Sequence, residues 1–255
     1  MSTSPESAAG RRREWTLVAV VLFPLVLLLA RPPMAQDLKY HALVDTRAFL
    51  GIPNFMDVAS NIPFLLLGVA GLLVCSRGRV AGAVHSWQVL FAGVTLVFFG
   101  SAYYHWNPNN ATLVWDRVPM TIAFMGLFVG LASEHVGARL ERVLLAPAVA
   151  VGIGSVAWWA YSGDLRVYYW VQATPLLSIV FVLAAWRGRY THRACLAGGL
   201  LAYALAKGAE FHDREIYALT CQVMSGHTLK HLLAALGIGF IYLMLSRRQQ
   251  VILTV

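Results

Sequence analysis

Histidines at helical spacing are the first sign of chemistry in this chain of 255 residues. His227 and His231 are four residues apart, so on a helix both imidazoles point to one side and can reach one metal ion. Ser101 and His105 have the same spacing at the end of an earlier apolar stretch. Three imidazoles plus a water molecule are typical of catalytic zinc, whereas structural zinc sites are usually closed by four protein ligands. We therefore predict a zinc site formed by His105, His227 and His231.

A third polar motif, residues 115–120 (WDRVPM), stands at the start of another apolar segment. Its aspartate, Asp116, adds a carboxylate that could act beside a metal. A salt bridge with Arg117 at the start of a helix is the alternative interpretation. Ser101 likewise has a simpler interpretation, which is packing between helices.

Five further polar residues keep two interpretations open. Glu210 and Asp213 can orient a ligand imidazole from behind, or they can form ion pairs in a solvated loop. His212, which lies between them, is a weaker candidate for a metal ligand. Asp57 and Asn61, four residues apart on one helix face, can brace the site or form a structural hydrogen bond between helices.

The elements that must position these residues are apolar. Hydrophobic residues make up 58% of the chain, and the mean hydropathy is +0.63, whereas soluble domains are about 45–50% apolar. A helix that spans a bilayer needs roughly 20 mostly apolar residues. Eight segments have about this length: 15–31, 58–76, 85–104, 117–134, 143–161, 167–186, 194–209 and 228–246. Because backbone polar groups must be satisfied within lipid, we predict an all-α polytopic transmembrane helical bundle.

The distribution of Lys and Arg predicts the orientation of this bundle. If residues before the first segment are cytoplasmic, the inner connections carry more Lys and Arg than the outer ones, as the positive-inside rule requires. The net charge of +8 then faces anionic headgroups, so no nucleic-acid partner is needed to explain it. The same topology places all three polar motifs at the outer face. We expect an integral protein of a bacterial inner membrane, with both termini cytoplasmic.

The polar motifs resemble those of the alkaline ceramidase family, most of all its bacterial alkaline phytoceramidase members. Four stretches carry the resemblance: 54–61 (NFMDVASN), 100–105 (GSAYYH), 116–120 (DRVPM) and 225–231 (SGHTLKH). Their order and spacing match over about residues 40–246. The wider superfamily includes the progestin and adipoQ receptors.

The resemblance implies a seven-helix core to which segment 15–31 is an N-terminal addition. We accordingly divide the chain into residues 1–36 (a cytoplasmic N-terminus and an extra transmembrane helix), 37–246 (the seven-helix ceramidase-like domain) and 247–255 (a cytoplasmic tail). Arginines before the first apolar run also resemble a secretory signal. Cleavage after Ala35 would put Pro33 where a small residue is preferred, so we expect the helix to be retained.

The resemblance also implies a reaction. Zinc on the three histidines, with Asp116 and Ser101 at the reaction centre, would cleave the amide of ceramide-like or other N-acyl lipids into a fatty acid and a long-chain amine. Asp116 would act as general base and then acid, and Ser101 would donate to the developing oxyanion. Besides this substrate and the bilayer, we expect neither a nucleic-acid partner nor an obligate protein partner.

One departure from the family concerns calcium. Eukaryotic alkaline ceramidases bind calcium through an acidic cluster ahead of the first core helix, and Asn54 here stands where the family has a glutamate. Asp45 and Asp57 remain, but calcium needs about six to eight oxygen ligands. We predict no calcium site.

Two other functions are consistent with part of the pattern. A receptor or signalling protein of the same superfamily would hold a structural zinc. A metal or proton transporter would need ionisable residues along the membrane depth, and the middle of these segments shows almost none.

Overall fold

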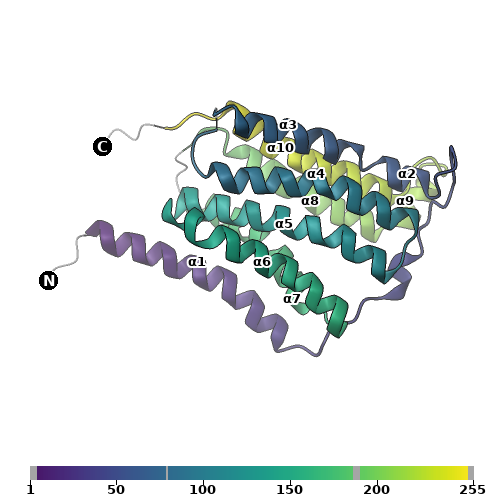
Figure 1. The fold of residues 1–255 in the computed structure, drawn as a ribbon, viewed down its shortest axis with the longest axis horizontal. Coiled ribbons are helices and arrows are strands. Elements are labelled where there is room, and N and C mark those ends of the chain that lie inside the picture. The colour runs from purple at the N-terminus through teal and green to yellow at the C-terminus, as the bar shows by residue number, and fades with distance from the viewer. Residues whose placement is uncertain (1–4, 79, 186–189, 252–255) are drawn as a thin grey trace.

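The computed structural model describes residues 5–78, 80–185 and 190–251, and over these the chain is an all-α helical bundle (Figure 1). The helices are α1 (Pro5–Leu29), η1 (Leu38–His41), α2 (Phe55–Ala59), α3 (Ile62–Ser76), α4 (Val84–Trp106), α5 (Asn110–His135), α6 (Arg139–Ser162), α7 (Arg166–Ala185), α8 (Ala194–Phe211), α9 (Asp213–Leu219) and α10 (Gly226–Arg247). The predicted fold class is confirmed.

Among the described residues, six stretches of helix are long and apolar enough to cross a membrane. They are Phe55–Ser76, Val84–Trp106, Asn110–His135, Arg139–Ser162, Arg166–Ala184 and Gly226–Arg247. The other two predicted segments are the long helices α1 and α8. Both carry charged residues near one end, Arg11 to Glu14 in α1 and Lys207 and Glu210 in α8. Residue 186 of the sixth predicted segment, Arg79, Arg187 and Arg189 of the inner connections and residues 252–255 of the tail lie outside the described residues.

Glycines allow the central helices to approach closely. A methyl group on Gly93 of α4 would lie 2.5 Å from the backbone nitrogen of Ala123 on α5. A methyl group on Gly68 of α3 would lie 2.6 Å from the backbone nitrogen of Thr95 on α4. Small residues at such crossings are typical of helices that associate in membranes, where close packing replaces the hydrophobic effect. α4 is thereby held between α3 and α5.

The start of α5 differs from the prediction. The helix begins at Asn110 rather than near residue 117, because Asn109 caps it and accepts the backbone N–H groups of Ala111 and Thr112 at 2.9 and 3.1 Å. The Thr112 hydroxyl accepts the Asn109 N–H in return at 3.2 Å, which completes a capping box. Asp116 therefore lies in the second turn of the helix and not at its start.

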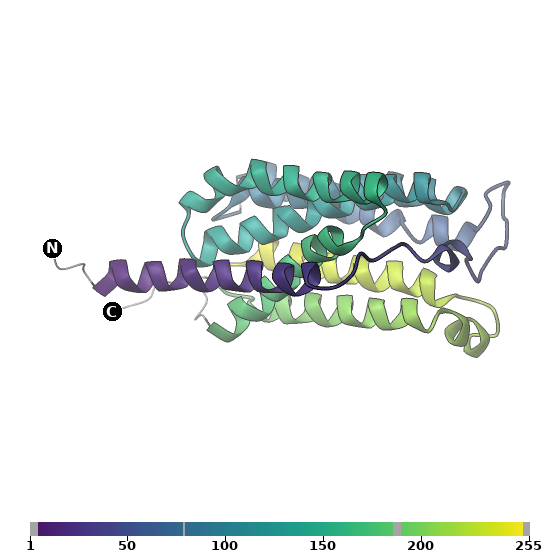
Figure 2. The same ribbon diagram turned by 90° about the horizontal axis from the view of Figure 1, so that it is seen from below.

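Helix α1 lies along one flank of the bundle (Figure 2), where it packs on α7. The Trp170 indole on α7 donates to the Val21 carbonyl oxygen at 2.7 Å. Beyond the helix, Arg166 donates to the Arg31 carbonyl oxygen at 2.6 Å. Most large apolar side chains of α1 remain exposed, among them Phe23 at 65%. A surface of this kind suits contact with lipid tails.

Candidate metal centre

Three buried histidines meet where α4 ends and α10 begins. His105 lies in the last turn of α4, and His227 and His231 lie in the first two turns of α10. Their ring centroids are 4.7 to 4.9 Å apart, and one ligand atom of each lies within 4.8 Å of the others. All three side chains are buried. The residues chosen by spacing are therefore brought together as a group that could hold a metal ion.

The start of α10 is fixed by local contacts. The Ser225 hydroxyl caps the helix by accepting the Thr228 N–H at 2.9 Å. A methyl group on Gly226 would lie 2.2 Å from a backbone carbonyl oxygen of α8, so glycine permits this close approach. The Asp213 carboxylate accepts the His227 N–H at 2.7 Å. Burial raises the pKa of Asp213, and the His227 N–H opposes that rise.

Residues between α2 and α3 hold His231 from behind. The Ser60 hydroxyl donates to the Asp57 carbonyl oxygen at 3.1 Å and lies 2.8 Å from His231 Nδ1. It therefore accepts the Nδ1 proton, which leaves Nε2 as the nitrogen able to bind a metal. The Asp57 carboxylate accepts the Thr228 hydroxyl at 2.7 Å, which ties α2 to α10. Asp57 thus forms a hydrogen bond between helices, whereas the Asn61 amide donates within its own segment, to the Asp57 carbonyl oxygen at 2.8 Å.

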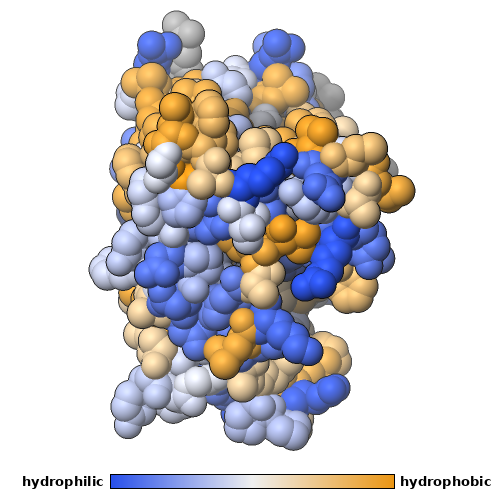
Figure 3. All heavy atoms as spheres, turned by 90° about the vertical axis from the view of Figure 1, so that its right-hand side faces the viewer, coloured by the Kyte–Doolittle hydropathy of each residue, from blue (hydrophilic) through white to orange (hydrophobic). Residues whose placement is uncertain are grey.

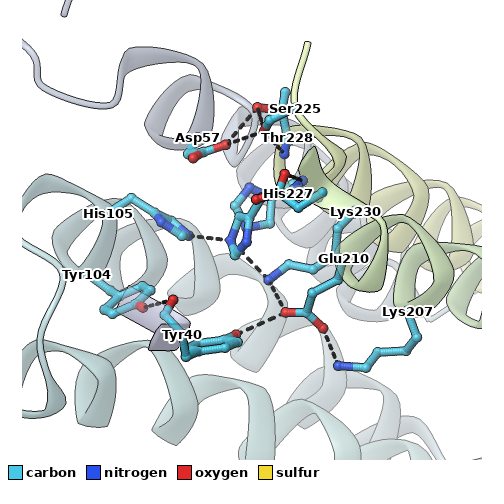
Figure 4. A network of polar contacts seen from close by, with 12 residues as sticks. Tyr40, Asp57, Tyr104, His105, Lys207, Glu210, Ser225, His227, Thr228 and Lys230 are labelled. Atoms are coloured by element: carbon cyan, nitrogen blue, oxygen red, sulfur yellow. Dashed lines mark hydrogen bonds and ion pairs between the residues drawn. The ribbon is translucent and has the colours of Figure 1, made fainter. Parts of the chain in front are cut away.

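A charged network borders the histidines (Figure 4). Lys230 Nζ lies 3.0 Å from His227 Nε2 and 2.8 Å from the Glu210 carboxylate. Glu210 also pairs with Lys207 and accepts the Tyr40 hydroxyl at 3.0 Å. Burial and the nearby Glu210 charge raise the pKa of Tyr40, so the phenol stays protonated and donates this bond.

The network bears on interpretations left open by the sequence. Glu210 forms ion pairs with Lys207 and Lys230, and Lys230 also contacts His227. His212 is exposed and does not belong to the histidine group. The prediction omitted Lys230 and Tyr40. The sequence held one signal for Lys230, because this residue lies between the two α10 histidines.

A cavity of about 220 Å³ connects His231, one of the three histidines, with the predicted residues Ser101 and Asp116. Its polar part includes His231, Lys230, Ser101 and Asp116. Ser101 on α4 and Asp116 on α5 therefore line the same part of the cavity. Its apolar part includes Phe64, Leu90, Val94, Ala123, Leu127 and Ile238. The arrangement suits a ligand with one polar group and a hydrocarbon chain.

A salt bridge with Arg117 was the alternative interpretation of Asp116, and among the described residues Arg117 does not form it. In the described part of the chain, its guanidinium donates to the Gln36 amide oxygen at 2.5 Å instead. The guanidinium carbon also lies 4.1 and 4.6 Å from the ring centroids of Trp159 and Tyr168. Asp116 itself lines the cavity.

Asp45 and Asn54, in the segment compared above with a calcium-binding cluster, contact other protein groups. Arg47 binds the Asp45 carboxylate through two nitrogens at 2.8 and 2.6 Å. Burial opposes ionisation of Asp45, but the Arg47 hydrogen bonds hold its pKa below the ordinary value. The Asn54 side chain donates to the His105 carbonyl oxygen at 2.7 Å and so supports the end of α4.

No protein-family model matches the chain, and no curated protein matches it. Its function is therefore inferred from the site and from the motifs.

Proposed function

We propose that this chain is a zinc-dependent membrane amidohydrolase that cleaves the N-acyl bond of ceramide-like lipids to a fatty acid and a long-chain amine. One observation carries the proposal: His231, one of three clustered histidines, lines a cavity together with Ser101, Asp116 and an apolar wall. Three protein ligands leave a coordination position open, as catalytic zinc sites do. The resemblance to alkaline ceramidases supports the same reaction.

The histidines fit zinc by their chemistry. Zinc accepts neutral imidazole nitrogens, and the bond between Ser60 and His231 Nδ1 favours the tautomer that offers Nε2. His105 Nδ1 is buried without a hydrogen-bond partner among the described residues, so a metal on this ring would not compete with an internal contact there. Bound zinc lowers the pKa of water to about 7 and polarises a carbonyl group.

The remaining steps belong to side chains of this protein. Asp116 takes the proton of the attacking water and passes it to the leaving amine, as general base and then general acid. The Ser101 hydroxyl donates to the carbonyl oxygen as negative charge develops there. The apolar wall receives the acyl chain and excludes water from the amide. The site lies at the end of the bundle shown in Figure 3, where hydrophilic residues gather beside apolar flanks.

The first test measures zinc in the purified protein. We expect about one zinc per chain in the wild type and loss of that zinc in His227→Ala, because two imidazoles hold zinc far less tightly than three. His212→Ala is the matched control, since it removes an exposed histidine of the same face and should keep the metal. Wild-type protein that binds no zinc under controlled loading would refute the metal mechanism.

The second test measures hydrolysis of a ceramide by the zinc-loaded protein in detergent. Asp116→Asn should keep its zinc and lose roughly 10²–10⁴-fold in rate, which is the usual contribution of a general acid–base. Glu215→Gln, a change at an exposed acid of α9, should leave the rate unchanged. Full activity in Asp116→Asn would contradict the assigned role.

A receptor or signalling protein with a structural zinc is the second candidate. The resemblance extends to the receptors of the same superfamily, and the histidine group could hold a structural metal as well as a catalytic one. Such a protein would bind zinc, hydrolyse no lipid and tolerate Asp116→Asn.

A further inference from the structure

Among the described residues, Arg117 is a buried charge that forms no direct ion pair, although the neighbouring Asp116 interacts with it electrostatically. The exposed fraction of Arg117 is 6%. Two other arginines with largely buried side chains are each paired to a carboxylate, Arg166 with Asp164 at 2.7 Å and Arg248 with Glu134 at 2.6 Å. Within the described ranges, no carboxylate oxygen lies within ion-pair distance of Arg117. A buried guanidinium is costly unless an anion compensates it.

The contacts of Arg117 orient the group without neutralising it. Gln36 accepts from Nη2, and the rings of Trp159 and Tyr168 flank the guanidinium carbon at 4.1 and 4.6 Å. These contacts fix the plane of the guanidinium, as cation–π contacts do. Nη1 is left buried with no hydrogen-bond partner in the part of the chain that the structure describes. One edge of a rigid donor fork therefore remains available.

Arg117 lines the cavity of the candidate site. Arg117, Gln36 and Tyr168 all line that cavity, together with Lys230 and Lys207. Glu210 is shared by the two lysines, so this carboxylate cannot balance both ammonium groups. With Asp116 as the remaining carboxylate of the lining, the cavity walls carry three cations and two anions. The excess positive charge favours an anionic ligand.

We infer that Arg117 binds an acidic group, a carboxylate or a phosphate, on the lipid that occupies this cavity. Arginine offers paired N–H groups that match both anions, and such charge-assisted bonds are stronger than neutral ones. The inference rests on the proposed function in taking the cavity as the lipid site, and it narrows the substrate class from neutral ceramides to N-acyl lipids with an acidic headgroup.

The test uses three amphiphiles that share a hexadecyl chain and an ether spacer. They are 2-hexadecyloxyethanol, hexadecyloxyacetate and hexadecyloxyethyl phosphate, and they differ in the terminal group. None has an amide, so binding is measured without hydrolysis and fails or succeeds independently of the proposed reaction. Binding is measured by equilibrium titration of the full-length protein in nanodiscs of neutral lipid.

In the wild type, at least one anionic amphiphile should bind about tenfold or more tightly than the alcohol, a difference of roughly 1.4 kcal/mol. The tighter of the two anions identifies the headgroup chemistry. Arg117→Gln should reduce the preference to below about twofold. Lys39→Gln is the matched control. It removes one positive charge from an exposed side chain of η1, and the preference for the anionic amphiphile should remain.

Arg117→Lys tests whether a result with Arg117→Gln reflects a folding defect. This variant retains the charge between the same two rings and should retain part of the preference for the anionic amphiphile. Thermal unfolding of each variant is measured in the same nanodiscs. Equal binding of the alcohol and both anions to the wild type would overturn the inference, as would an unchanged preference in a folded Arg117→Gln protein.

Discussion

Lys230 is the residue that most changes how the histidine group would bind a metal. Its ammonium lies 3.0 Å from His227 Nε2, so it donates to a nitrogen that a metal would need. A bound metal and this ammonium would repel each other, by about 4 kcal/mol for two unit charges 4 Å apart at an effective dielectric constant near 20. Metal binding must therefore displace Lys230 toward Glu210, its carboxylate partner at 2.8 Å.

We predict that Lys230→Gln binds zinc about tenfold or more tightly than the wild type, because the competing donor and its charge are removed. Zinc affinity can be measured by competition with a chromogenic chelator. Lys207→Gln is the matched control, since it removes the other lysine partner of Glu210 and leaves His227 untouched. Weaker zinc binding in Lys230→Gln would show that the lysine supports the metal site.

Among individual residues, the sequence predicted contacts that follow from local spacing and missed contacts that depend on the whole fold. The histidine spacing within one helix is local, so the pairing of His227 with His231 could be predicted directly. The contact between Tyr40 and Glu210 joins residues 170 positions apart, and no local pattern encodes it. The bond between Arg117 and Gln36 was missed for the same reason, because it depends on how the segment before η1 lies against α5.

Among the helices, the contact of α4 with α5 controls the distance between Ser101 and Asp116. A methyl group on Gly100 would lie 2.0 Å from the carbonyl oxygen of Trp115, a backbone atom that cannot move aside. The start of α5 was predicted too late because its first turns are polar. The capping signal of Asn109 and Thr112 marks the true beginning and places Asp116 opposite α4.

We predict that Gly100→Ala destabilises the protein by about 1–3 kcal/mol, the usual cost of overpacking, and also lowers hydrolysis by separating the two helices. Gly154→Ala on α6 is the matched control, because a methyl group there meets nothing within 4 Å. The control should be neutral or slightly stabilising. Unfolding in detergent and initial rates measure both effects, and equal behaviour of the two variants would contradict the predicted clash.

At the other end of the bundle, α5 and α10 are joined by a buried ion pair. Glu134 and Arg248 approach to 2.6 Å, and each side chain is 2% exposed. We predict that Glu134→Gln destabilises the protein by about 3–5 kcal/mol, because it leaves the Arg248 charge buried without its partner. The Trp87 indole should keep its acceptor in this variant. Combined with Arg248→Gln, the loss should be smaller than the sum of the single losses, as unfolding measurements of all three variants can show.

For the whole molecule, the exposed Cys221 allows the orientation to be tested. It lies in the turn between α9 and α10, the helix whose first two turns hold His227 and His231, whereas Cys75 and Cys195 lie in the last turn of α3 and the first turn of α8. We predict that a membrane-impermeant maleimide labels Cys221 in intact spheroplasts. Cys221→Ser should abolish this labelling. Labelling of Cys221 that requires membrane disruption would reverse the proposed topology.

The flanking position of α1 has a consequence for biosynthesis. Val21 and its partner Trp170 are 149 positions apart, so α1 leaves the ribosome long before α7 exists. At synthesis rates of about 5–20 residues per second, the interval is on the order of ten seconds. During this interval the exposed apolar surface of α1 has no α7 to pack on. The contact between the two helices therefore belongs to a late step of folding.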